Sequence, residues 1–345
     1  MRNINRRSFI RTSVIGGAAL TFLRPAFSGY NNLTEADYSA SVGLTTGTNR
    51  ADMVFRALKP YSQQVRLASS GKRIILKPNN VSIDIPLCAT HADTLEGILE
   101  FFRSIGRTDN IVIAESAANG PTMDGFSNYG YLKLAEKYPV KFIDLDKEST
   151  EFLYAFDEKD YRPHPVRVSK PMLDPGSYIV SVARMKTHDR VIATLSLKNI
   201  VVGSPVKDAG FTWDNRRRAG AVNDKPLIHG SGFKGINYNL YALAPRLHPH
   251  LAVIDGFEGM EGNGPNAGTR VDHRVCVVST DWLAADRVGI ELMGIDFSKV
   301  AYLNYCAQTG QGIADLNKIE ILGERIKDHI IKYRLSDNIK EQIII

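Results

Sequence analysis

The chain has 345 residues, with 43 Lys and Arg against 37 Asp and Glu and a formal net charge of +6. Residues 1–28 hold five arginines and no acidic residue, which leaves 38 basic against 37 acidic residues in the rest of the chain. The rest of the chain is therefore almost neutral, which argues against a nucleic-acid partner. A composition of 43% hydrophobic and 23% charged residues excludes disordered, collagen-like and coiled-coil chains.

The first 28 residues are typical of an export signal. A basic segment precedes the short apolar stretch Val14–Leu23, and Ala26–Ser28 forms a small-residue cleavage site. This stretch of ten residues is about half as long as a membrane-spanning helix, so we expect no permanent membrane span. The pair Arg6 and Arg7, followed by Ser8–Arg11, resembles the twin-arginine signal. We therefore expect export by the twin-arginine machinery to the periplasm and cleavage after Ser28, with an ordinary Sec signal or a soluble basic tail as the alternatives.

Beyond the signal, strands and helices are predicted to alternate along the chain. The apolar spacing predicts helices over Arg50–Gln64, Ala92–Ile105, Tyr129–Tyr138 and Asp281–Met293. Short apolar runs predict strands over Lys72–Lys77, Ile111–Glu115, Val140–Leu145, Tyr178–Ala183, Leu251–Asp255, Val275–Ser279 and Lys318–Leu322. This order predicts an α/β fold with a largely parallel sheet flanked by helices, as one large domain or two intimate lobes.

Two stretches interrupt this alternation. Phe152–Pro171 reads as an irregular or hairpin insertion, and Gly203–His229 is polar and loop-like. The latter includes Arg216, Arg217 and Arg218, which we interpret as a solvated charged face. The domain boundaries that we predict are a signal over 1–28, an N-terminal extension with a helix over 29–71, an α/β domain over 72–323 and a C-terminal extension over 324–345.

Polar side chains follow several of these strands, and ligands of open α/β sheets bind at the carboxyl ends of the strands. Three lysines at such ends, Lys77, Lys186 and Lys198, suit an anionic substrate or cofactor, and a buried lysine can also act in covalent or base chemistry. We expect Lys77 to bind the anion, and Lys186 and Lys198 to take part in catalysis. The anion site is expected to include Asn79, Asn199, Gly262 and Gly264.

Carboxylates and histidines also gather at these strand ends. Asp255, Glu258 and Glu261 offer oxygen ligands for a divalent cation, or they act as general bases or pair with the lysines. Glu261 is thus both a candidate metal ligand and a candidate catalytic residue. His188 is a candidate acid or base, and His229 is a second histidine that could serve in this way.

Several familiar sites are excluded by the pattern. The segment Gly262–Ala267 formally matches a dinucleotide fingerprint but leads into no predicted helix, so we interpret it as a glycine-rich loop whose amides bind an anion. No phosphate-binding P-loop and no nucleophile elbow occurs. The three cysteines are widely spaced, so neither a disulfide framework nor a cysteine metal site is expected.

Taken together, these segments resemble the family known as domain of unknown function 362. The resemblance extends from about Lys72 to Gly323. It rests on Lys77-Pro78-Asn79, Ala114-Glu115-Ser116, Tyr129-Gly130-Tyr131, Lys186-Thr187-His188, Ser196-Leu197-Lys198-Asn199, Asp255-Gly256, Gly259–Pro265, Asp281, Asp286 and Gly294. Some family members carry ferredoxin-like segments, whose cysteine clusters this chain lacks, so the resemblance implies no iron–sulfur cluster here.

These observations favour an exported enzyme that acts on a small anionic molecule, with a divalent cation as a candidate cofactor and the reaction class open. A non-catalytic periplasmic binding module for an anion or a metal is the alternative. A scaffold protein whose polar strand ends form only structural salt bridges is a third reading.

Overall fold

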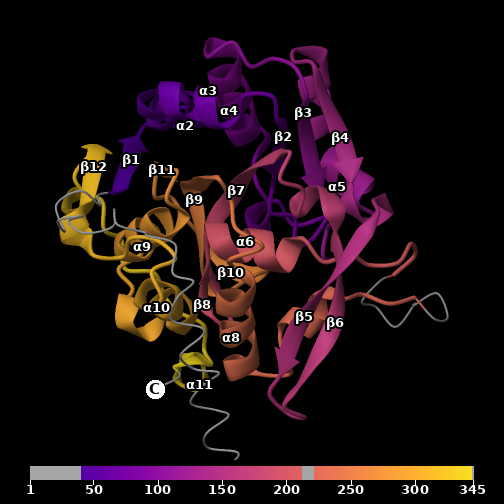
Figure 1. Ribbon diagram of the computed structural model, residues 1–345. Coiled ribbons are helices and arrows are strands. Elements are labelled where there is room, and N and C mark those ends of the chain that lie inside the picture. The colour runs from indigo at the N-terminus through magenta and orange to yellow at the C-terminus, as the bar shows by residue number, and fades with distance from the viewer. Residues whose placement is uncertain (1–39, 212–220, 344–345) are drawn as a thin grey trace, which may run out of the picture. The chain divides into compact units, whose positions relative to one another are not determined.

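One mixed sheet organises the part of the chain that the structure describes. The structure is a computed structural model, and it describes residues 40–211 and 221–343. Within these residues the sheet has ten strands, and its order is β12-β1-β11-β9-β7-β2-β3-β4, with β8 paired to β7 and β10 to β9 (Figure 1). The strands are β1 (Ala40–Thr46), β2 (Arg73–Lys77), β3 (Ile111–Glu115), β4 (Val140–Asp144), β7 (Ser177–His188), β8 (Ile192–Thr194), β9 (Leu251–Asn263), β10 (Ala267–Val271), β11 (Val275–Ser279) and β12 (Ile319–Gly323).

The centre of this sheet is parallel, as the sequence predicts. From β9 through β7, β2 and β3 to β4, each strand is parallel to the next, whereas β11 is antiparallel to both β9 and β1. The predicted α/β class with a largely parallel sheet is confirmed. The strand β1, which lies inside the predicted N-terminal extension, pairs with β11 and β12 in this same sheet.

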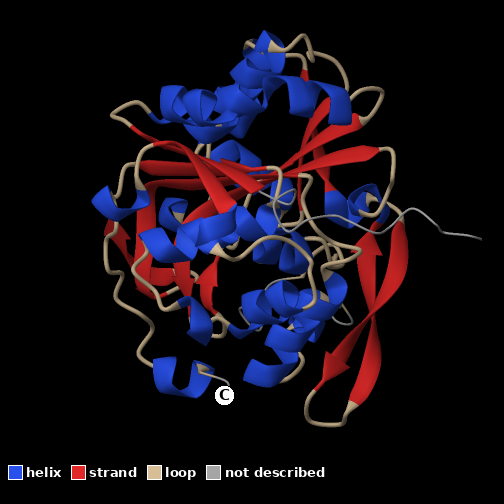
Figure 2. Ribbon diagram, turned by 60° about the vertical axis from the view of Figure 1, so that its left-hand side comes forward, coloured by secondary structure: helices blue, strands red, loops and turns tan. Residues whose placement is uncertain are grey.

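Helices cover both faces of the sheet (Figure 2). Because side chains alternate along a strand, Ile74 and Leu76 face one layer while Ile75 faces the other. The first layer contains α2 (Arg50–Leu58), α3 (Ser62–Ala68) and α4 (Ala92–Ser104). The second contains α6 (Ser196–Gly203), α8 (Phe233–Leu243), α9 (Trp282–Leu292) and α10 (Ala301–Gln308). Both faces of the central strands are thus buried, which explains their unbroken apolar runs.

The interruptions of the pattern have distinct structures. The segment at Phe152–Pro171 is an antiparallel hairpin of β5 (Thr150–Asp157) and β6 (Arg162–Ser169), outside the main sheet. The predicted helix at Tyr129–Tyr138 is a 3₁₀ helix over Tyr131–Glu136, preceded by α5 (Thr122–Asn128). Two further short helices are α7 (Lys225–Ile228) and α11 (Ile339–Gln342).

Two strands continue past their predicted ends, and this changes where the candidate site residues lie. The strand β7 runs on to His188, and β9 runs on to Asn263 with a register shift opposite Arg184 and Lys186. Lys186 and His188 therefore lie on a strand, paired with β8, and not in a loop that follows a strand.

Some predictions fall outside the described residues, namely the export signal over 1–28 and Arg216, Arg217 and Arg218. Across the two described ranges, no helix combines the length and the apolar character that crossing a membrane requires.

Candidate functional site

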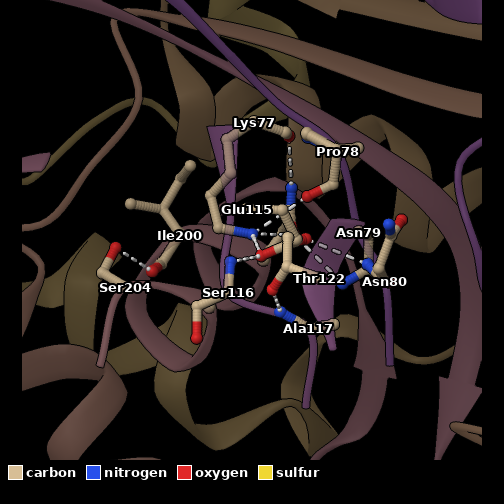
Figure 3. Close-up of polar contacts among 12 residues, drawn as sticks. Lys77, Pro78, Asn79, Asn80, Glu115, Ser116, Ala117, Thr122, Ile200 and Ser204 are labelled. Carbon is tan, nitrogen blue, oxygen red and sulfur yellow. Dashed lines mark hydrogen bonds and ion pairs between the residues drawn. The ribbon is translucent and has the colours of Figure 1, made fainter. Parts of the chain in front are cut away.

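The carboxyl ends of β2 and β3 meet in a buried ion pair. Lys77 Nζ lies 2.7 Å from Glu115 Oε1 and also donates to the Pro78 carbonyl at 2.9 Å and to Asn199 Oδ1 at 3.2 Å (Figure 3). These bonds use all three donors of the ammonium group. Burial lowers the pKa of Lys77, and the adjacent Glu115 carboxylate opposes that shift. Lys77 is therefore bound by internal acceptors, and its predicted contact with an anion would require one of them to be displaced.

The segment Ser196–Asn199 forms the first turn of α6, and the Ser196 and Asn199 side chains have separate partners. The Asp286 carboxylate, from α9, accepts the Ser196 amide at 2.8 Å, the Ser196 hydroxyl at 2.5 Å and the Leu197 amide at 3.1 Å. Asn199 Nδ2 donates to the Lys77 carbonyl and to Ser181 Oγ, both at 3.1 Å. These bonds fix the start of α6 against β2 and β7, and with it the position of Lys198.

A cavity opens beside this turn, at the ends of β2, β3 and β7. It consists of two adjoining hollows, a wide part of about 350 Å³ and a narrow part of about 40 Å³ that we call the inner part; Val81, Ala118, Lys198, Val202 and Lys225 line both. We call this cavity the lysine pocket. Its polar lining residues are Lys77, Asn79, Asn80, Glu115, Ser116, Thr194, Asn199 and Lys225 in the inner part, and His188, Asp189, Arg190, Lys198 and His229 in the wide part.

Two lysines of this pocket differ in how they are bonded. Lys225 Nζ donates to the carbonyls of Gly203 and Pro205, at 3.2 and 2.5 Å. Lys198 Nζ has no hydrogen bond or ion pair with any residue that the structure describes, although the residue is only 5% exposed. Burial, together with the charge of Lys186, lowers the pKa of Lys198 to about 7, and burial lowers that of Lys225 to about 7. Both groups therefore titrate near neutral pH.

The inner part of the pocket holds buried polar atoms that lack partners. Within the described residues, Asn79 Oδ1, Asn80 Nδ2 and Thr194 Oγ1 are buried and make no hydrogen bond. A buried polar group without a partner costs roughly 1–3 kcal/mol, so such atoms are normally satisfied by water or by a ligand. Donors and acceptors for a small polar molecule are thus present next to Lys198.

Two histidines of the wide part hold opposite tautomers. The Arg190 amide donates to His188 Nδ1 at 3.0 Å, so the hydrogen of the neutral His188 ring is on Nε2. His229 Nδ1 donates to the Lys225 carbonyl at 3.3 Å, which leaves His229 Nε2 as an acceptor. Burial and the charge of Lys198 lower the pKa of both rings, that of His229 to about 4. Because His188 is neutral, its 3.2 Å contact with Asp189 is not an ion pair.

Lys186 lies near the lysine pocket but not on its wall. Its side chain is fully buried, and Nζ donates to the Cys88 carbonyl at 2.8 Å. Burial lowers the pKa of Lys186 to about 8. The positive charge of Lys186 is one of the two causes that lower the pKa of Lys198.

The acidic trio does not form the predicted metal site. Asp255 accepts from Thr94 Oγ1 at 2.7 Å, Glu258 pairs with Arg50 at 3.0 Å, and Glu261 accepts the Arg334 amide at 2.8 Å. Within residues 40–211 and 221–343, no group of three or more His, Cys, Asp or Glu side chains could hold a metal ion. The strand β9 continues through all three positions: Arg50 lies against both Asp255, at 3.5 Å, and Glu258, whereas Glu261 meets Arg334.

The predicted glycine-rich anion loop is also differently arranged. Gly262 donates its amide to the Arg334 carbonyl at 2.6 Å, and Gly264 donates to the Gly262 carbonyl at 2.8 Å. Neither amide is directed at the lysine pocket, and these glycines serve packing: a Cβ at Gly264 would overlap the Thr187 carbonyl. Only Pro265 of this segment lines the pocket.

Of the predicted site residues, the structure thus gathers Lys77, Asn79, Asn199, Lys198 and His188 around one cavity, while Glu261 lies apart. Sequence reasoning missed Lys225, Asn80 and Thr194. Lys225 follows a polar stretch with no predicted element, so its local sequence carries no signal of burial. Asn80 directly follows Pro78-Asn79 at the end of β2, and that position is a signal that could have identified it.

Comparisons with known proteins identify the family to which this chain belongs. The chain is 22% identical over 241 residues to the thylakoid-associated protein sll1697 of Synechocystis, which covers 69% of this chain and 68% of the relative. A crystal structure of a Thermotoga maritima protein overlaps 77% of this chain and 60% of its own, with 10% identity and a TM-score of 0.40. The model of a domain of unknown function, DUF362, matches residues 74–291, which is more than half of the chain, so the protein belongs to the DUF362 family.

Proposed function

We propose that this protein is an enzyme that binds a small anionic molecule in the lysine pocket. The observation that carries the proposal is Lys198, a buried lysine with no hydrogen-bond partner among the described residues, beside three unsatisfied polar atoms. An unpaired amine in such a place is costly to the folded protein unless a ligand completes its bonding. A volume of about 350 Å³ suits a small molecule.

The charge of the pocket favours an anion. Besides Lys198 and Lys225, the wall includes Arg190 and Lys77. Of its two carboxylates, Glu115 is already bound by Lys77 and by the Asn80 amide, and the Asp189 side chain is 44% exposed. A ligand with a carboxylate or phosphate group would therefore replace missing acceptors for Lys198 and Lys225.

An enzyme is favoured over a pure binding module by the two histidines. His188 offers a ring N–H and His229 a ring lone pair, so the pocket has both a proton donor and a proton acceptor beside the lysines. A binding module needs only the charge. The variant His188→Ala distinguishes an enzyme from a binding module. A binding module should still bind its ligand, whereas an enzyme should lose at least 10²-fold in turnover.

Calorimetric titration of the protein with sulfate, inorganic phosphate, acetate, oxalate and succinate tests the binding. We expect at least one of these anions to bind, and Lys198→Met to weaken that binding tenfold or more, a loss of about 1.4 kcal/mol. Lys234 is exposed and does not line the pocket, so Lys234→Met is the matched control. Equal affinity in Lys198→Met and wild type, or no binding of any anion, would contradict the proposal.

We also propose that the chain is exported to the periplasm by the twin-arginine route. Arg6 and Arg7, the short apolar stretch and the small-residue cleavage site support this proposal. Replacing both arginines by lysine should leave the precursor in the cytoplasm, as detected by cell fractionation. Undiminished export of that variant would instead favour the Sec route.

A further inference from the structure

We propose that Lys198 forms a Schiff base with the carbonyl carbon of a small anionic oxo compound bound in the lysine pocket. The substrate class is an aldehyde or ketone that carries a carboxylate or a phosphate group. This inference rests on the proposed function, because the substrate must first bind in the anion site. It goes further by naming the covalent bond that Lys198 forms with that substrate.

Lys198 stands apart from the other lysines near the pocket. Lys77 donates all three of its hydrogen bonds to protein acceptors, Lys186 donates to the Cys88 carbonyl, and Lys225 donates to two carbonyls. The nitrogen atoms of these three lysines are thus held by protein acceptors. Among the described residues, no acceptor binds Lys198 Nζ, and the group lines both parts of the cavity. Its nitrogen is thus placed to react with a ligand.

The surroundings also favour the neutral amine, which is the nucleophilic form. Burial of Lys198 and the nearby positive charge of Lys186 both disfavour its charged form. The carboxylate of Asp189 has the opposite effect, but its side chain is 44% exposed. With a pKa of about 7, Lys198 has a large fraction of free amine at neutral pH. Exposed lysines, with a pKa near 10.4, have almost none.

The rest of the pocket can hold the substrate during the reaction. Lys225 lines both parts and donates to two carbonyls, so its remaining donor can bind the anionic group. His188 Nε2–H can then donate to the carbonyl oxygen, and His229 Nε2 can accept a proton from the attacking nitrogen. In each histidine, Nδ1 is bonded to a backbone group, so Nε2 is the ring nitrogen that remains free for the substrate.

The step balances without an oxidant or a metal. The Lys198 nitrogen bonds to the carbonyl carbon, the C–O bond breaks, and the oxygen leaves as water with the two protons that the amine loses. Histidine transfers those protons from nitrogen to oxygen. The imine that remains can take up a proton and withdraw electrons from the neighbouring carbon, which is the use of lysine in covalent catalysis.

Reductive trapping tests the inference on the full chain. The protein is incubated with sodium cyanoborohydride and pyruvate, 2-oxoglutarate or glyceraldehyde 3-phosphate, and its intact mass and peptides are measured. We expect one adduct per chain on the peptide that contains Lys198, and the compound that reacts shows whether the anionic group is a carboxylate or a phosphate. Lactate, the hydroxy analogue of pyruvate, should compete with pyruvate but give no adduct.

Two variants complete the experiment. Lys198→Arg keeps the positive charge but cannot form the imine, so it should lose the adduct at least 50-fold while the anion still binds. Lys234→Arg, at an exposed site, should react like the wild type. Two results would contradict the Schiff base: the oxo compound binds without an adduct at Lys198, or adducts form on many exposed lysines. Neither result would contradict the proposed anion site. No binding of any anion would remove both proposals.

Discussion

Lys77 Nζ and Glu115 Oε1 lie 2.7 Å apart, and their side chains are 0% and 2% exposed. This ion pair joins the ends of β2 and β3, and both residues line the inner part of the lysine pocket. We expect Glu115→Gln to lower the free energy of unfolding by about 3–5 kcal/mol, because it leaves a buried ammonium group without its counterion. Urea denaturation followed by circular dichroism measures the loss. The double variant Lys77→Met/Glu115→Leu should lose less than Glu115→Gln alone, and a larger loss would contradict this account.

Asp286 positions the reactive turn. Its carboxylate accepts three hydrogen bonds from Ser196 and Leu197 at the start of α6. Asp286→Asn keeps the size but replaces one acceptor oxygen by a donor, so we expect a loss of about 2–3 kcal/mol in unfolding free energy. Sulfate affinity, measured by calorimetry, should fall at least fivefold because Lys198 moves with the turn. Ser196→Ala removes a single bond and should cost only about 1 kcal/mol; equal losses in both variants would count against the assignment.

Sulfate binding should weaken as the pH rises above 7. The pKa values of Lys198 and Lys225 are about 7 in the empty pocket, so both must gain protons to bind a dianion at higher pH. The affinity should fall by up to tenfold per pH unit for each lysine between pH 7 and 9, while sulfate itself keeps its charge. Calorimetry in two buffers of different ionisation enthalpy should detect the proton uptake. A flat profile would show that neither lysine titrates in this range.

The same two lysines should make the free protein more stable as the pH rises. Their pKa values are lower in the folded chain than the usual 10.4 of an unfolded one, so above pH 7 the unfolded state binds more protons. The free energy of unfolding should therefore rise from pH 7 to pH 9 in the absence of anions, as followed by urea denaturation. Lys198→Met/Lys225→Met should show a flatter dependence than Lys234→Met, and an equal slope in both would refute the linkage.

Lys186 should set the pH range in which Lys198 works. Burial and the charge of Lys186 both lower the pKa of Lys198, so Lys186→Met removes one of the two causes. We expect the pH at which sulfate binding weakens to move upward by about half a unit or more, as measured by calorimetry from pH 6 to 9. A purely structural Lys186 would change stability and leave this midpoint in place.

The fold was largely predictable from the sequence, for a local reason. Runs such as Ile111–Glu115 and Tyr178–Ala183 are apolar on both faces, and this pattern indicates a strand buried in a parallel sheet. The ends of β7 and β9 were not predictable in this way. Their later residues are polar, and they continue as strands because β8 and β10 pair with them.

The sequence predicted where the candidate site lies better than it predicted which residues belong to the site. Strand order brings the ends of β2, β3 and β7 together, so Lys77, Asn79 and His188 were expected to meet near one ligand. Glu258 and Glu261 were expected there too, but long-range partners decide otherwise: Arg270 lies 2.7 Å from Glu258, and the Arg334 amide lies 2.8 Å from Glu261.

By itself, the sequence determined the α/β class, the central parallel strands and the edge of the sheet at which lysines collect. Only the tertiary structure decided which buried lysine is left without a protein acceptor and can therefore bind a ligand. Lys77 and Lys198 are both buried and both follow predicted strands, yet Glu115 and Asn199 bind the first, and no described residue binds the second. The difference arises because the bonding of a buried charge depends on residues brought from distant parts of the chain, which no local pattern records.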